Sequence, residues 1–190
     1  MLITCNIETL ENATISNSVT LVPRLEYSVN LLDGIIEILK KKRHELKKLN
    51  KFLVTDFDET DMAHLKAIEL ERITSFSLDL LSQIKKRIGK ISGVNSIPEI
   101  LPTSIPLVRT VSAQLFDFLP NCSQKLSELS VHLGSIVLDS AVLTKARFDF
   151  SQSNEKSSIL LNEVKLMVDS KINKQYPNLD FSKACNNWQY

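Results

Sequence analysis

Five leucines recur at seven-residue intervals in one stretch of this chain, and this spacing most constrains how the chain can fold. They are Leu25, Leu32, Leu39, Leu46 and Leu53. Because two turns of an α-helix take about seven residues, all five lie along one stripe, the leucine seam. Val29 and Ile36 fill a companion line four residues after the first two leucines, and Arg43 takes its third place. A seam of this length predicts a long helix paired with another helix, and it argues against an enzyme pocket.

The composition favours an all-α protein with one domain, or one domain with a tail. Of the 190 residues, 43% are hydrophobic, which is enough for a core, and only four are glycine and six are proline. Aromatic residues make up 6%, a low share for a β-sandwich or a β-barrel. The net charge of +1 gives no overall field that would draw the chain onto nucleic acid, so we expect no nucleic-acid partner.

The sequence carries no motif for catalysis or for binding a cofactor or metal. The three cysteines, Cys5, Cys122 and Cys185, lie far apart, so neither a zinc site nor a disulfide framework is indicated. Phosphate-binding loops, dinucleotide loops and the usual hydrolase signatures do not occur. We therefore expect a non-enzyme without cofactors, with free thiols in the reducing cytosol. With no secretory signal and no run of about 18 apolar residues, we expect membrane contact only from outside the hydrocarbon.

Apolar spacing and its interruptions predict a long antiparallel helical hairpin over residues 23–92. Residues 1–22 are polar, and we expect a flexible arm there, with Pro23 in the first turn of the first helix. The acidic stretch 55–61 interrupts the pattern. A second helix follows, with apolar residues three to five apart, and ends near a pair of glycines. Two amphipathic helices joined by a short loop fold back on each other.

The second half of the chain predicts an elbow, two short helices and a separate amphipathic helix. Pro98, Pro102 and Pro106 recur every fourth residue, and proline disfavours a helix, so 93–105 is expected to be an elbow. The short helices are expected in 106–150, with a break at Leu119-Pro120. A polar break at 151–154 then precedes a last helix within 151–179, and a tail covers 180–190.

The last helix carries an apolar line that something must bury. Its members are Leu160, Val164, Met167 and Val168. Because the polar break before it leaves the helix free to dock on the hairpin or to leave, we interpret it as a detachable regulatory cover.

Basic residues gather in the distal half of the first helix, and five of them are the predicted membrane or partner surface. These five are Lys40, Lys41, Lys47, Lys48 and Lys51. Each base near an anionic membrane contributes on the order of 1 kcal/mol. The alternative is a solvated face balanced by the acidic residues of 55–61. Off the leucine line, Leu31, Ile35 and Ile38 are candidates for packing against neighbouring subunits.

The order of these elements resembles the ESCRT-III family, and within it the archaeal cell-division (Cdv) B-type proteins. The stretch 105–142, IPLVRTVSAQLFDFLPNCSQKLSELSVHLGSIVLDSAV, is similar to the family pattern of a short helix, a Leu-Pro break and a Ser-x-x-Leu-x-x-Leu-x-x-x-Leu helix. The end of the last helix, 171–179, looks like the end of the Cdv B-type core. The resemblance covers residues 21–179.

The resemblance implies a membrane-remodelling filament subunit. Such proteins polymerise with themselves and with paralogues on the cytoplasmic face of an anionic membrane, constrict it at the division site, and are removed by a separate AAA ATPase. The tail of this chain is not proline-rich, so the ATPase is expected to act through other subunits or through the last helix. The alternative is a soluble coiled-coil adaptor or scaffold that forms discrete dimers, which explains the leucine seam equally well.

Overall fold

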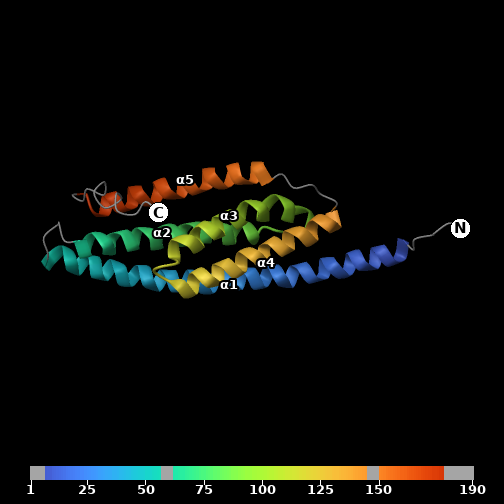
Figure 1. Ribbon diagram of the computed structural model, residues 1–190, viewed down its shortest axis with the longest axis horizontal. Helices are drawn as coiled ribbons and strands as arrows, with labels where there is room; N and C mark the ends of the chain where they lie inside the picture. Colours follow the sequence, from blue (N-terminus) through green and yellow to red (C-terminus); the bar gives the residue numbers. More distant parts are fainter. Residues whose placement is uncertain (1–6, 57–61, 145–149, 178–190) are drawn as a thin grey trace.

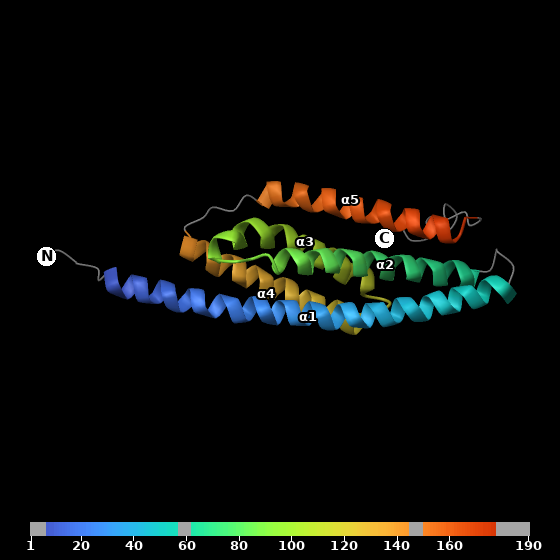
Figure 2. The same ribbon diagram turned by 180° about the vertical axis from the view of Figure 1, so that it is seen from behind.

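The computed structural model describes residues 7–56, 62–144 and 150–177, and they confirm the all-α prediction. Five α-helices and one short 3₁₀ helix make up this part of the chain, which contains no β-strand. The elements are α1 (Ile7–Asp56), α2 (Met62–Ile88), the 3₁₀ helix η1 (Val94–Ser96), α3 (Ile97–Leu115), α4 (Pro120–Thr144) and α5 (Phe150–Gln175). They form an elongated bundle in which α1 and α5 lie on opposite sides (Figures 1 and 2).

The helix α1 begins well before the predicted position. Its 50 residues correspond to a rod of about 75 Å. Residues 7–22, expected to be a flexible arm, belong to this helix, and Pro23 lies inside it instead of in its first turn. Although proline removes one helical hydrogen bond, Leu21 is buried and Leu25 packs against the core on the other side of Pro23. Tertiary burial on both sides of the proline therefore outweighs its local preference.

The helices α1 and α2 pack side by side and run in opposite directions (Figures 1 and 2). The leucine seam supplies much of this contact, since Leu32, Leu39 and Leu46 are buried, while Leu25 and Leu53 are half-buried. From α2, Ile68, Leu80 and Ile84 are wholly buried. The expected acidic break is shorter than 55–61 because α1 continues through residue 56, and residues 57–61 lie outside the described part.

The predicted elbow at 93–105 is mostly wrong. Only η1 and its flanks depart from α-helix, and α3 runs from Ile97 through all three prolines. Pro98 lies in the first turn, where the missing N–H has no helical partner in any case. Pro102 and Pro106 lie inside the helix, whose burial of Ile97, Leu101 and Leu107 offsets the lost hydrogen bonds.

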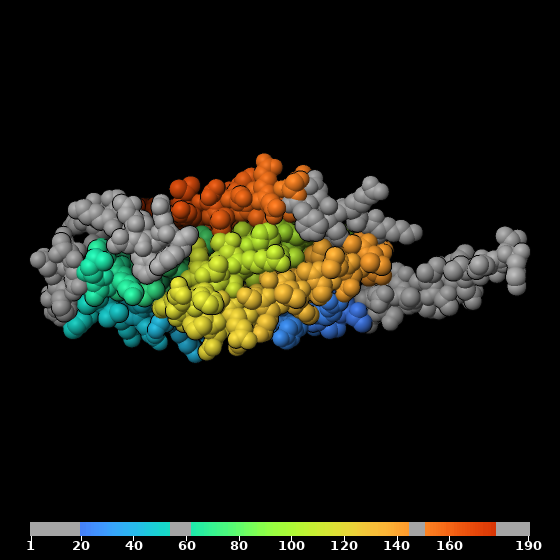
Figure 3. All heavy atoms as spheres, viewed as in Figure 1, coloured from blue at the N-terminus to red at the C-terminus, as the bar shows by residue number. Residues whose placement is uncertain are grey.

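The helices α3 and α4 form a second antiparallel pair, which packs against α1 and α2. Pro120 occupies the first position of α4, where proline is favoured. Two buried serines tie the pair together, because the Ser112 hydroxyl donates to the Ser123 carbonyl and the Ser123 hydroxyl donates to the Ser112 carbonyl, each at 2.8 Å. Figure 3 shows α3 and α4 covering the middle of one face.

The helix α5 packs on α2 and α3, away from α1 (Figures 1 and 2). The predicted polar break at 151–154 is wrong, because these residues form the first turns of α5. The Ser157 hydroxyl lies 2.7 Å from the Ser153 carbonyl in the preceding turn and 2.8 Å from the Thr103 carbonyl of α3, and it can donate its one proton to either carbonyl. This contact anchors the start of α5 to the bundle.

Candidate functional site

The predicted lysine surface lies on a face of α1 that points away from the rest of the bundle. Lys40, Lys41, Lys48 and Lys51 are exposed, and Lys47 is half-buried. The opposite face of the helix carries the leucine seam. The five lysines therefore share the outer half of α1, and we call this set the α1 lysine surface.

Carboxylates on the same helix neutralise only part of this charge. Lys40 pairs with Glu37 at 2.6 Å, and Lys42 pairs with Glu45 at 3.1 Å. Within the described residues, the other four members of the α1 lysine surface form no ion pair. Pairs at exposed positions contribute little, since they are screened by solvent. The surface therefore keeps a local positive charge on a chain that is close to neutral overall.

Exposed apolar residues near the distal end of α1 were not among the predicted site residues. Leu49 and Phe52 are exposed there, Phe52 to 61%, and Met62 is exposed at the start of α2. We call these three residues the tip cluster. A position off the leucine seam is the sequence feature that indicates their exposure. Phe52, for example, immediately precedes Leu53, and adjacent residues on a helix are turned by about 100°.

The three candidates for packing against neighbouring subunits have different environments. Ile35 is buried in the core and is not available to another subunit. Leu31 is half-buried and packs against the core, and Ile38 is exposed. The prediction is therefore wrong for Ile35, because α1 contacts α4 as well as α2 and so buries a wider stripe than the leucine seam alone.

The predicted apolar line of α5 is the side that docks on the bundle, with one exception. Leu160, Val164 and Val168 are buried, and Ile172 and Tyr176 continue their line. Met167 is 45% exposed and does not belong to it, since it stands one residue, or about 100°, from Val168. Ion pairs flank the line: Arg72 pairs with Asp169 at 3.2 Å, and Lys171 pairs with Asp79 at 2.9 Å.

A buried polar cluster, which was not among the predicted site residues, joins the end of α5 to α1 and α2. The Glu71 carboxylate is wholly buried; it accepts hydrogen bonds from Asn50 at 2.7 Å and from the Tyr176 hydroxyl at 2.8 Å. Gln175 adds a longer bond to Glu71 at 3.4 Å. Burial, together with the hydrogen bond to Glu71, raises the pKa of Tyr176. We call Asn50, Glu71 and Tyr176 the polar latch.

The latch has an unsatisfied neighbour. His64 is buried beside it, with its ring centroid 6.5 Å from that of Tyr176 in an edge-to-face arrangement. Among the residues that the structure describes, neither ring nitrogen of His64 has a hydrogen-bond partner. Buried polar atoms without partners destabilise the state that buries them. The hydrogen bonds of the polar latch therefore hold α5 on the bundle, while the buried His64 beside them lowers the stability of the docked state.

Two further features bear on function. In the described part of the chain, no group of three or more His, Cys, Asp or Glu residues is arranged to hold a metal ion.

One described helix, α4, is long and apolar enough to cross a membrane by length and composition, although the sequence has no uninterrupted apolar run of that length. Core helices pass the same test, and α4 buries Leu126, Leu129 and Leu133 against the bundle.

No family model matches the chain, and no solved structure matches it.

Proposed function

We propose that this chain is a membrane-remodelling filament subunit of the ESCRT-III type. In this proposal, copies of the chain and related subunits polymerise on the cytoplasmic face of an anionic membrane and help to constrict it during cell division. A separate AAA ATPase removes them, acting through other subunits or through α5. The proposal rests on the resemblance of the sequence together with the positions of the α1 lysine surface and of α5.

The observation that carries the proposal is the unneutralised α1 lysine surface on an outward face of the longest helix. A rod of about 75 Å presents these lysines without covering them with another described helix. If each lysine close to an anionic surface contributes on the order of 1 kcal/mol, four of them change the membrane affinity by roughly a thousandfold. The surface thus suits an anionic lipid headgroup region better than a neutral one.

The burial of the leucine seam favours this proposal over the discrete coiled-coil dimer. Leu32, Leu39 and Leu46 already pack inside the single chain, so the seam is not free to zip onto a second copy. Self-association would then use other surfaces of the bundle. That arrangement suits a subunit that folds first and assembles afterwards.

The test is binding to anionic vesicles by flotation, with the fold checked by circular dichroism. Reversing Lys40, Lys47, Lys48 and Lys51 to Glu is expected to release the protein from vesicles. The matched control reverses four exposed lysines elsewhere, which are Lys66, Lys125, Lys165 and Lys174. This control has the same net charge but is expected to remain bound.

Salt provides a second readout. The screening length falls from about 10 Å at 0.1 M salt to about 3 Å at 1 M, so binding of the parent chain is expected to weaken over this range. Equal loss of binding in both reversed proteins would mean that overall charge, and not the α1 lysine surface, attracts the chain. Unchanged binding in the first variant would remove this surface from the proposal.

A further inference from the structure

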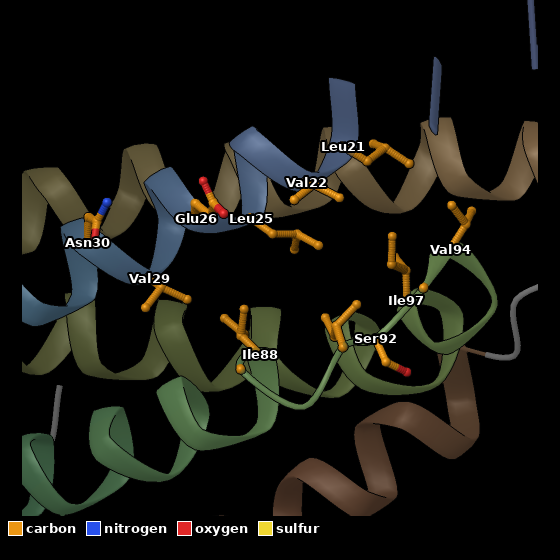
Figure 4. A pocket seen from close by; sticks show the side chains of 13 residues that line it. Leu21, Val22, Leu25, Glu26, Val29, Asn30, Ile88, Ser92, Val94 and Ile97 are labelled. Atoms are coloured by element: carbon orange, nitrogen blue, oxygen red, sulfur yellow. The ribbon is translucent and has the colours of Figure 1, made fainter. Parts of the chain in front are cut away.

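A hollow opens between α1 and the turn that follows α2, and we call it the end groove. The helix α2 ends at Ile88, and the chain then turns away through η1 into α3, while α1 continues past this turn (Figures 1 and 2). The end groove has a volume of about 760 Å³. Figure 4 shows Leu25 and Val29 of α1 facing Ile88 and Ile97 across it.

The walls of the end groove are mostly aliphatic and reach the surface. Val22 on the α1 wall is 57% exposed, and Ile91 and Val94 on the opposite wall are half-buried. A Cβ atom at Gly93, which also lines the groove, would meet no other atom within 4 Å. No described residue of α5 lines the groove, so docking of α5 leaves it open. Its volume and apolar walls are those of a site for a small ligand.

The length of the α1 wall matches an extended hydrocarbon chain. From Leu21 to Asn30, which both line the groove, α1 rises by about 14 Å. An extended chain advances about 1.2 Å per bonded atom, since three backbone atoms span about 3.5 Å, so about twelve carbons match this wall. Each methylene that leaves water for an apolar site raises the affinity roughly fourfold. A long unbranched chain therefore gains more from this groove than a compact polar ligand does.

The charges beside the end groove favour an anionic head group. Of the described residues that line it, only Glu26 is charged, and it lies on the α1 wall. Lys85, in the last turn of α2, is paired with Asp33 and adds no net charge. Three further cations lie in or just after this turn and form no ion pair with any described residue: Lys86, Arg87 and Lys90. Three positive charges at the α2 end against one negative charge on α1 attract an anionic group to the α2 end.

We propose that the end groove binds a single-chain anionic amphiphile, a long-chain carboxylate taken up from water. Its hydrocarbon chain lies along Leu25 and Val29, and its head group lies toward Lys86 and Lys90. A chain that leaves water gains the full hydrophobic contribution, whereas a chain already in a bilayer has equally apolar surroundings and gains little. The occupant is therefore a dissolved amphiphile and not a membrane lipid. This inference goes beyond the proposed function and does not depend on it.

A bound chain contacts three elements at once, because the residues that line the end groove come from α1, from the end of α2 and from the segment that leads into α3. A ligand that binds only the folded chain stabilises it in proportion to the logarithm of the ligand concentration. The melting temperature is therefore expected to rise with the concentration of ligand, which gives a readout besides binding itself.

The test titrates the full chain with laurate, a twelve-carbon carboxylate, in lipid-free solution and below the concentration at which laurate forms micelles. Isothermal titration calorimetry is expected to show one laurate bound per chain. Hexanoate, which lacks six of the methylenes, is expected to bind at least a hundredfold more weakly. Val22→Asp places a carboxylate on the apolar wall and is expected to weaken laurate binding at least tenfold. The matched control, Val142→Asp, adds the same charge at an exposed position on α4 and should bind as the parent does.

A second pair of variants tests the head group. Changing Lys86 and Lys90 together to Gln is expected to weaken laurate binding by roughly fivefold at low salt, and the difference should fade at 1 M salt. The control changes two exposed lysines elsewhere, Lys66 and Lys125, to Gln and should leave the affinity unchanged. Equal affinities in the two double variants would overturn the assignment of the head group. Circular dichroism verifies the fold of every variant.

Three results overturn the inference as a whole. They are the absence of saturable laurate binding, equal binding by Val22→Asp and the parent, and uptake of many laurate molecules per chain with one common affinity. Dimerisation of the ligand-free parent that Val22→Asp abolishes would place a second copy in the end groove and would also overturn it. Vesicle flotation of the parent and of its lysine-reversed variant decides the proposed function separately, so either idea can fail while the other stands.

Discussion

The polar latch makes the docking of α5 open to a single-atom test. Tyr176→Phe removes only the hydroxyl, which donates to Glu71 at 2.8 Å and accepts from Gln175 at 2.8 Å, and the ring stays in its buried place. A hydrogen bond to a charged group contributes about 1.5–3 kcal/mol. Glu71 would retain Asn50 at 2.7 Å and the long bond from Gln175, so the buried carboxylate stays partly satisfied. We therefore expect a loss of about 2 kcal/mol in the docking of α5.

Hydrogen exchange followed by mass spectrometry measures this loss. Since about 1.4 kcal/mol changes a population tenfold, amide exchange in α5 is expected to speed up roughly 10- to 100-fold, with little change in α3 and α4. Leu166→Ala on the exposed side of α5 is the control and should leave exchange unchanged. Unaltered exchange in Tyr176→Phe would refute the latch, and equal acceleration in every helix would mean that the hydroxyl supports the whole fold.

The pH dependence supplies a second readout of the same bond. Because burial and Glu71 raise the pKa of docked Tyr176 above its ordinary value of 10, docking favours the protonated phenol. This contribution is fully present below about pH 10 and is lost as the pH rises further, since the released phenol ionises first. Exchange in α5 is therefore expected to increase above about pH 10 more steeply in the parent than in Tyr176→Phe, after correction for intrinsic exchange.

Two further predictions concern the core and the cover. Leu32→Ala is expected to lower the free energy of unfolding in urea by about 2–5 kcal/mol, because the Leu32 side chain is wholly buried. Leu53 is half-buried, so Leu53→Ala should lower the free energy of unfolding by markedly less. Equal losses in the two variants would contradict the assignment of the leucine seam. Ending the chain at Phe150 removes most of α5 and is expected to lower the concentration at which filaments appear in light scattering and electron microscopy; a truncated chain that stays monodisperse where the parent assembles would place α5 in the polymer contact instead.

Periodicity predicted the parts of the fold in which burial and local preference agree. The leucine seam and the line Leu160–Val164–Val168 are buried because a helix repeats its face every three or four residues. The same rule did not show that Val168 is buried and Met167 exposed. Both residues are apolar, and only the position of the docking surface decides which of two adjacent residues it buries. A seam residue can therefore be predicted from spacing, whereas the edge of a buried stripe depends on which helices pack beside it.

The prolines and the polar latch show where local patterns are insufficient. Pro102 lies within α3 because tertiary burial outweighs a preference that the sequence expresses strongly. Glu71 follows Ile68 by three residues and so falls on the buried stripe of α2, a signal that was visible in the sequence. Its partner Tyr176, however, is 105 residues away, and no local pattern pairs residues at such a separation.

The polar latch also links the release of α5 to assembly. Asn50 and Glu71 belong to the α1–α2 pair, and Tyr176 and Gln175 belong to the end of α5, so undocking of α5 removes two hydrogen bonds to the Glu71 carboxylate and leaves it with Asn50 alone. If a neighbouring copy binds only after α5 leaves, the apparent affinity scales with the released population while that population is small. Tyr176→Phe should then lower the concentration needed for assembly by the same factor by which it speeds exchange in α5. Faster exchange with an unchanged assembly threshold would separate the two events and assign α5 a structural role only.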